Sequence, residues 1–203
     1  MFLGHFAVGL AAKPFTPKAS LGVLLVATQV PDIVFGVFLI VGVTTGGATP
    51  WDHGLVMAAV WSIIAFAIAF LISRDLRTGI VVGILVLSHW AGDFIAWDRA
   101  LPLAFAGSPL VGLGLYNSVV VMIAGDFALF AGAIAIYLWK TKANDRVGTW
   151  AFWLMVAYIL AMMPACVLPG KLLAIVSFLI MLLLPFGVWI DRHRSAISAA
   201  RGG

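Results

Sequence analysis

Histidine and aspartate side chains that can bind a metal ion lie inside segments that are otherwise almost free of ionisable groups. His89 and Asp93 are four residues apart. On a helix this spacing places both side chains on one face, one turn apart. The pair can chelate one divalent ion, or Asp93 can orient the imidazole of His89. The spacing therefore favours a metal-binding or catalytic role over a purely structural one.

Three further side chains of the same kind precede this pair in the chain. Asp32 directly follows a proline, which removes a helix hydrogen bond and bends the helix. The complete set comprises His5, Asp32, His53, His89 and Asp93. Three imidazoles and two carboxylates can bind zinc or another divalent ion without any thiolate. A carboxylate outside the metal's coordination sphere, Asp32 or Asp52, can serve as a general base.

These residues also have structural interpretations. A single aspartate or histidine inside a membrane helix can simply hydrogen-bond to another helix. For Asp126 this role and a supporting or proton-related role fit the sequence about equally well. His5 and His53, taken singly, are more typical of structural histidines. The metal-site hypothesis therefore depends on the set as a whole, whose members come from four separate segments.

The composition determines the kind of elements that must position these residues. Of 203 residues, 64% are hydrophobic and only 10% are charged, whereas soluble domains carry roughly 25% charged residues. So apolar a chain requires lipid as its solvent. The sequence contains no glutamate, which excludes the H-E-x-x-H zinc protease motif. Its net charge of +4 comes without a basic run interleaved with aromatics, so we expect no nucleic-acid partner.

Six apolar segments have close to the roughly 20 residues that cross a bilayer. They are Ala19–Val43, His53–Ile72, Gly79–Trp97, Ser118–Trp139, Trp150–Leu168 and Leu172–Ile190. Phe2–Ala12 is too short to span and is expected to be an interfacial helix or one that enters the membrane part-way. We therefore predict one all-α domain over residues 1–203, a polytopic membrane helix bundle. It has a short N-terminal helix and loop (1–18), six spans (19–190) and a basic tail (191–203).

The distribution of Lys and Arg predicts the orientation of this bundle. With the N-terminus in the cytoplasm, ten of the 12 Lys and Arg residues fall on the cytoplasmic side. Only Arg99 and Lys171 then lie outside. Cytoplasmic loops carry such an excess of positive charge. The sequence thus predicts both termini in the cytoplasm and a multi-pass protein of the inner, or plasma, membrane.

Four short motifs, taken in order, resemble those of a bacterial protein family. They are Gly4-His5, Pro31-Asp32-Ile33, Asp52-His53-Gly54-Leu55 and Leu87-Ser88-His89-x3-Asp93. The family comprises membrane-bound proteins predicted to be metal-dependent hydrolases, and its named members include LexA-regulated inner-membrane proteins. The resemblance is strongest over residues 1–100. It implies that the metal-site candidates are His5, Asp32, His53, His89 and Asp93.

The chain departs from the pattern of that family at three places. The second acid of its P-D-x-D motif is Val34 here, and the serine after the histidine of its H-S-L motif is Gly54. An upstream histidine of some members has no counterpart beside Trp51 and Asp52. These differences are compatible with one metal rather than two, or with a loss of activity.

The first functional hypothesis is a metal-dependent hydrolase at the outer half of the bilayer, with zinc the expected ion. Its substrate would be lipidic, because a cavity between spans opens sideways to lipid. Arg99 and Asn117, in the predicted outer loops, are candidates for contact with a head group, and Asp126 for support. His5 can reach the site only if the N-terminal helix enters the membrane with its start pointing outward.

Two alternatives belong to other functional classes. A small proton-coupled or ion transporter would use Asp32, His89, Asp93 and Asp126 as a relay. A non-catalytic membrane subunit or lipid-binding relative of the hydrolases would explain the changes at Val34 and Gly54. Membrane lipid is a partner in every case, and the sequence leaves open a homo-oligomer or a place in a membrane complex.

Overall fold

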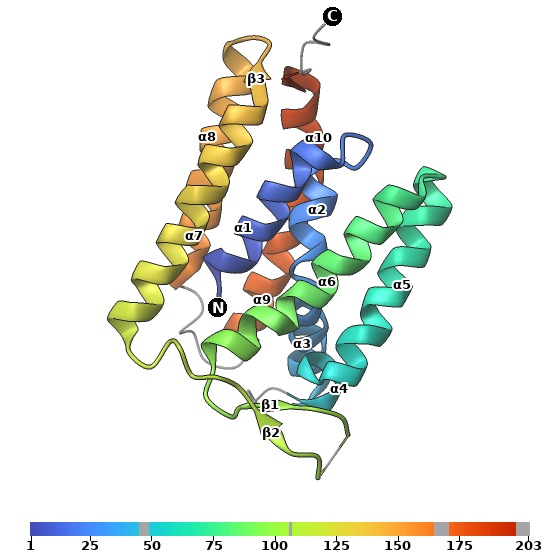
Figure 1. Cartoon of the computed structure of the whole chain (residues 1–203), viewed down its shortest axis with the longest axis vertical. Coiled ribbons are helices and arrows are strands. Elements are labelled where there is room, and N and C mark those ends of the chain that lie inside the picture. Colours follow the sequence, from blue (N-terminus) through green and yellow to red (C-terminus); the bar gives the residue numbers. More distant parts are fainter. Residues whose placement is uncertain (45–48, 106, 165–170, 198–203) are drawn as a thin grey trace, which may run out of the picture.

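The computed structural model describes residues 1–44, 49–105, 107–164 and 171–197. Nearly all regular structure in these residues is helical (Figure 1). The helices are α1 (Leu3–Ala12), α2 (Leu21–Ala27), α3 (Val30–Val41), α4 (Pro50–His53), α5 (Leu55–Ser73), α6 (Leu76–Ala96), α7 (Val119–Lys140), α8 (Arg146–Met162), α9 (Lys171–Leu179) and α10 (Leu183–His193). Short 3-10 turns occupy Lys13–Phe15 and Ile180–Leu182. The predicted all-α class is therefore confirmed.

Two small antiparallel strand pairs lie at opposite ends of the molecule (Figure 1). Strands β1 (Leu101–Pro102) and β2 (Leu110–Val111) pair within the long loop after α6. Strands β3 (Thr141–Ala143) and β4 (Arg194–Ala196) pair after α7 and α10 and so join the ends of these helices. The sequence did not predict these pairs. Residues 198–203 of the predicted basic tail lie outside the described residues.

The described chain has four helical segments long and apolar enough to cross a membrane, a finding compatible with a membrane protein. They are Leu55–Ser73, Leu76–Ala96, Val119–Lys140 and Leu172–His193. A fifth is obtained if α2 and α3, which meet at an angle of 61°, count as one broken span. The segment predicted at Trp150–Leu168 corresponds to α8, which has 17 residues, and residues 165–168 lie outside the described part. Six spans are thus not established by these helices.

The break between α2 and α3 occurs where the proline was expected to bend the span. Pro31 occupies the first turn of α3, a position that needs no backbone N–H donor. The break leaves the carbonyl of Thr28, at the end of α2, free of the regular helix pattern. It also places Asp32 in the first turn of α3, where the helix dipole favours a negative charge.

Helix α1 lies in the interior of the bundle, between α7 on one side and α2 and α6 on the other (Figure 1). Leu3, Phe6 and Leu10 are completely buried and belong to the main hydrophobic core. Of the two expectations for this helix, burial among other helices is compatible with entry into the membrane. The reason for this burial is that α1 is apolar on all sides, so burial against several helices removes more apolar surface than contact along one face.

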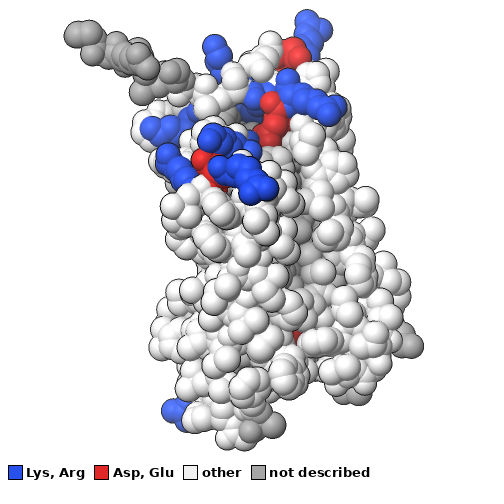
Figure 2. Space-filling model, turned by 90° about the vertical axis from the view of Figure 1, so that its right-hand side faces the viewer, with Lys and Arg blue, Asp and Glu red and all other residues white. Residues whose placement is uncertain are grey.

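The charged side chains are concentrated at one end of the molecule. Figure 2 shows Lys and Arg gathered at the end that carries β3 and the close of α10 in Figure 1. The middle of the molecule is almost free of charge on this face (Figure 2). Helix α5 illustrates the apolar middle, because only Ala58 of its 19 residues is buried although the helix is apolar throughout. A helix of that kind is suited to contact with lipid.

Candidate metal centre

His89 provides the central nitrogen of a buried cluster of histidines and aspartates. Its Nδ1 lies 2.7 Å from the carbonyl oxygen of Thr28, the carbonyl freed by the break before α3. Nδ1–H therefore donates to this oxygen, which leaves a lone pair on Nε2. Nε2 is buried and has no hydrogen-bond partner. It faces Asp93 Oδ2 at 3.3 Å and Asp32 Oδ1 at 3.6 Å.

His53 approaches the same two carboxylates from α4. Its Nε2 lies 3.4 Å from Asp32 Oδ1 and 3.8 Å from Asp93 Oδ2. Its Nδ1 lies 2.8 Å from Asp52 Oδ1, so Asp52 fixes the ring orientation in the same way that Thr28 does for His89. Both imidazoles thus direct Nε2 toward Asp32 and Asp93.

Asp52 is held in place by the start of its own helix. The backbone N–H of Thr49 donates to Asp52 Oδ1 at 2.7 Å, and the Thr49 hydroxyl donates to Oδ2 at 2.7 Å. These contacts form a capping box at the start of α4. Asp52 is fully buried behind His53, whereas the side chain of Asp32 is 30% exposed. Of the two candidate bases, Asp32 is therefore the one open to its surroundings.

Asp93 connects these groups to the N-terminal helix. Its Oδ1 lies 3.1 Å from His5 Nε2 and accepts a hydrogen bond of 3.1 Å from the indole N–H of Trp97. The amino group of Met1 also lies 2.9 Å from this oxygen. The His5 ring stacks on the ring of His89, with 3.8 Å between centroids and 11° between planes. His5 is thus part of the cluster, because α1 begins inside the bundle rather than at its surface.

Asp126 holds the start of α1 from the neighbouring helix α7. Its Oδ2 accepts from the backbone N–H of Phe2 at 2.9 Å and of Leu3 at 3.0 Å, and its Oδ1 accepts from Gly4 at 3.3 Å. The hydroxyl of Tyr116 adds a fourth hydrogen bond of 3.3 Å. Helix α1 has no side-chain cap of its own, so Asp126 satisfies amides that would otherwise be buried without acceptors. The ligand candidate His5 directly follows these three residues.

Two sequence candidates lie apart from this cluster, and several of its partners were not predicted. Arg99 and Asn117 are exposed, and neither contacts the five clustered residues in the described structure. The partners not predicted are Thr28, Thr49, Trp97 and Tyr116. Only Thr49 had a local signal, because Thr-x-x-Asp before an apolar run is typical of a capping box. Trp97 lies only four residues after Asp93 and Tyr116 ten residues before Asp126, whereas Thr28 and His89 are 61 positions apart.

Several separations among the four converging atoms are those of neighbouring ligands in a metal coordination sphere. With zinc–ligand distances of 2.0–2.1 Å, a tetrahedral site has ligands about 3.3 Å apart. The four distances from His53 Nε2 and His89 Nε2 to Asp32 Oδ1 and Asp93 Oδ2 range from 3.3 to 3.8 Å. Suitable atoms of His5, His89 and Asp93, and likewise of Asp32, His53 and His89, lie within 4.8 Å of one another. A divalent ion can therefore be held with little movement.

The charges of the cluster also fit a cation. Among the described residues, no Lys or Arg side chain forms an ion pair with Asp32, Asp52 or Asp93. The amino group of Met1, 2.9 Å from Asp93 Oδ1, compensates part of the negative charge. A buried carboxylate that is not fully compensated costs several kcal/mol. A divalent cation would offset this cost and would fill the lone pair of His89 that has no partner.

Comparisons of the chain with protein-family models, with curated proteins and with solved structures found no match.

Proposed function

We propose that the chain is a metal-dependent hydrolase embedded in the bacterial inner membrane, acting on a lipidic substrate near the outer half of the bilayer. One observation carries this proposal. His53 and His89 each have Nδ1 fixed by an acceptor while Nε2 faces the oxygens of Asp32 and Asp93. In metal sites, histidine ligands are oriented by such outer hydrogen bonds.

The proposed topology has six spans, with the loop after α1 and the end of α10 on the cytoplasmic side, while Met1 lies inside the bundle beside Asp93. The broken pair α2–α3 and the long apolar segments supply five, and α8 would be a short sixth. The basic end would face the cytoplasm, as positively charged loops do. His89 lies 13 residues beyond the start of α6 at that end, which corresponds to about 20 Å along the helix. The cluster then falls in the outer half of the bilayer.

The residues divide into ligands and positioning groups. Asp32, His53, His89 and Asp93 would hold the ion, for which zinc fits the nitrogen and oxygen donors best. When bound, such an ion lowers the pKa of its water to about 7 and polarises a phosphoryl or acyl oxygen. Asp52 orients His53. His5 contacts Asp93 Oδ1, whereas Oδ2 of the same carboxylate would bind the ion. Asp32, as the most exposed member, would either complete the ligand set or, if it stays outside it, receive a proton from an attacking water.

Aromatic side chains near the site support an apolar substrate. Trp51 directly precedes Asp52 in α4. The ring centroid of Trp51 lies 5.3 Å from that of Phe105. Trp97 reaches Asp93 with its indole N–H while about half of its surface is exposed. Tryptophan is typical of the boundary between lipid and water. Arg99, which is exposed two residues later, would contact an anionic head group.

A proton relay through Asp126 has less support from these contacts. Both of its oxygens accept hydrogen bonds from the start of α1. Protonation would weaken these acceptors and loosen a buried helix end, so the arrangement favours a structural carboxylate over one that titrates in a transport cycle.

Metal analysis of purified protein tests the proposal, with His89→Ala and His193→Ala as a matched pair. His193 is a histidine paired with Asp145 at the opposite end of the molecule. After loading with zinc and removal of excess, we expect about one ion per chain in the unmodified protein and in His193→Ala, and none in His89→Ala. Equal zinc in both variants, or no zinc in any of the three proteins, would refute the metal site.

Activity is then tested on the zinc-loaded protein in bilayer discs with phospholipid and lipid-phosphate probes. We expect turnover that His89→Ala abolishes and that His193→Ala retains. Zinc binding without turnover of any of these probes would instead support the non-catalytic, lipid-binding relative.

A further inference from the structure

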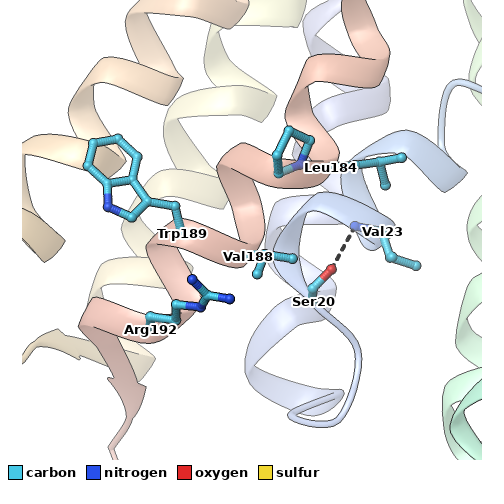
Figure 3. A pocket seen from close by; sticks show the side chains of 7 residues that line it. Ser20, Val23, Leu184, Val188, Trp189 and Arg192 are labelled. Carbon is cyan, nitrogen blue, oxygen red and sulfur yellow. Dashed lines mark hydrogen bonds between the residues drawn. The ribbon is translucent and has the colours of Figure 1, made fainter.

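A groove of about 360 Å³ lies between α2 and α10, close to the basic end of the molecule (Figure 3). Its lining residues are Ser20, Val23, Leu184, Pro185, Val188, Trp189 and Arg192. Apolar side chains form one part of the groove, and Arg192 and Ser20 provide polar groups at the other (Figure 3). The groove is separate from the histidine cluster and shares no residue with it.

The two helices that form the groove are in close contact through glycines. The backbone of Gly22 lies where a Cβ on Gly187 would be placed, and the backbone of Leu183 and Leu184 lies against Gly22 in the same way. Larger side chains at either glycine would push the helices apart. The close contact therefore fixes both walls of the groove relative to each other, so it is a preformed feature of the fold.

The polar groups of the groove are available to a ligand. The Ser20 hydroxyl oxygen accepts from the backbone N–H of Val23 at 3.2 Å, so its own hydrogen is left to donate. Nearby Lys13 and Lys18 are engaged with Asp191 and Asp75. Arg192 is exposed and has no acidic partner in the described part of the chain. The groove thus combines an unpaired guanidinium with an apolar floor.

We infer that this groove binds an anionic phospholipid from the leaflet at the basic end. The phosphate lies at Arg192, whose guanidinium matches phosphate oxygens in a two-pronged contact, and accepts from the Ser20 hydroxyl. An acyl chain follows Val23, Leu184 and Val188. Trp189, which is 40% exposed, lies at the level of the head group, as tryptophans at membrane surfaces do. Charge complementarity selects an anionic over a zwitterionic lipid.

Native mass spectrometry of the full chain, released from detergent with phosphatidylglycerol and phosphatidylcholine in equal amounts, tests this inference. The unmodified protein should retain phosphatidylglycerol preferentially. Arg192→Gln should lower that retention about 5-fold, the loss expected for one basic contact near a membrane surface. Arg77→Gln is the matched control, because Arg77 is an exposed arginine outside the groove, in the first turn of α6, and should leave retention unchanged.

A second variant separates the groove from general surface attraction. Val188→Trp narrows the apolar floor and keeps every charge, so it should also reduce phosphatidylglycerol retention. The inference fails if Arg192→Gln and Val188→Trp retain the lipid as the unmodified protein does. It fails equally if Arg77→Gln loses as much as Arg192→Gln, or if inorganic phosphate displaces the lipid, which would indicate a site for the free anion.

Discussion

The molecule pairs histidine with aspartate in two regions, and the pairs are completed differently. At the basic end, His193 Nδ1 lies 2.7 Å from Asp145 Oδ2, and the other oxygen of Asp145 accepts from the backbone N–H of Gly148 at 2.8 Å. Both side chains are partly exposed, so water can satisfy their remaining groups. In the interior, His89 Nε2 faces two carboxylate oxygens but has no hydrogen-bond partner among the described residues.

This difference indicates what the interior cluster lacks. A surface pair is complete with its partner and solvent, and it contributes little stability because water screens it. A buried histidine and two or more carboxylates need a group that supplies positive charge and accepts lone pairs. The same two residue types therefore form a self-contained ion pair at the surface and an incomplete ligand set in the core. The following predictions test that contrast, from the largest expected effect to the smallest.

Replacement of Asp93 by Asn should have the largest effect. Asp93 faces His5 with Oδ1 and faces His53 and His89 with Oδ2, so the change removes a negative charge that lies next to three imidazoles. We expect zinc affinity, measured by competition with a fluorescent chelator, to fall by more than the roughly 100-fold that loss of an outer partner can cause. Asp145→Asn removes the corresponding carboxylate at the basic end and should leave affinity unchanged. Equal zinc affinities for the two variants would contradict the proposed difference between the buried cluster and the surface pair.

Removal of the group behind His53 should have a smaller effect. In Asp52→Asn the carboxylate that orients His53 becomes a neutral amide, which should lower zinc affinity by about 10–100-fold. Thr49→Val is the control, because it removes the hydroxyl that contacts Asp52 but leaves the carboxylate itself. Zinc affinity that falls further in Thr49→Val than in Asp52→Asn would show that the start of α4, rather than the ring orientation, is decisive.

The position of His5 should depend on Asp126. In Asp126→Ala the amides of Phe2, Leu3 and Gly4 lose their acceptors, so the start of α1 should loosen and zinc affinity should fall by about 10-fold. Asp126→Asn keeps one acceptor oxygen, so its zinc affinity should lie between those of Asp126→Ala and the unmodified protein. Hydrogen exchange at these amides provides the second measurement. Faster exchange without any change in affinity would show that α1 does not position the site.

The smallest effect concerns the ion pair of Lys18 with Asp75 at the basic end. Hydrogen bonds from Lys18, and then from Thr78, lower the pKa of Asp75 from 3.8 to about 2. Because the pKa of Asp75 is lower in the folded than in the unfolded chain, its ionised carboxylate stabilises the fold above about pH 4. This contribution is lost as the pH falls toward 2. Lys18→Met should raise the pKa of Asp75, measured by a carbon NMR titration, without altering zinc affinity. An unchanged pKa would show that the pair does not form in solution.

Much of the helical architecture could be predicted from local sequence. Apolar runs with polar breaks gave the positions of the long helices, and Pro31 marked the break between α2 and α3. The residue types that can bind a metal were also visible, because ionisable groups are rare in apolar segments. The strand pairs and the shortness of α8 were not predicted, since they depend on how chain ends meet rather than on hydropathy.

The sequence by itself therefore determined which segments are apolar helices and which side chains in them can act as ligands. Only the tertiary structure decided that α1 enters the bundle, that Asp126 caps it, and that Thr28 orients the imidazole of His89. The physical reason is one of range. Hydropathy and helix spacing depend on neighbouring residues, whereas these contacts join residues up to 124 positions apart through packing of whole helices.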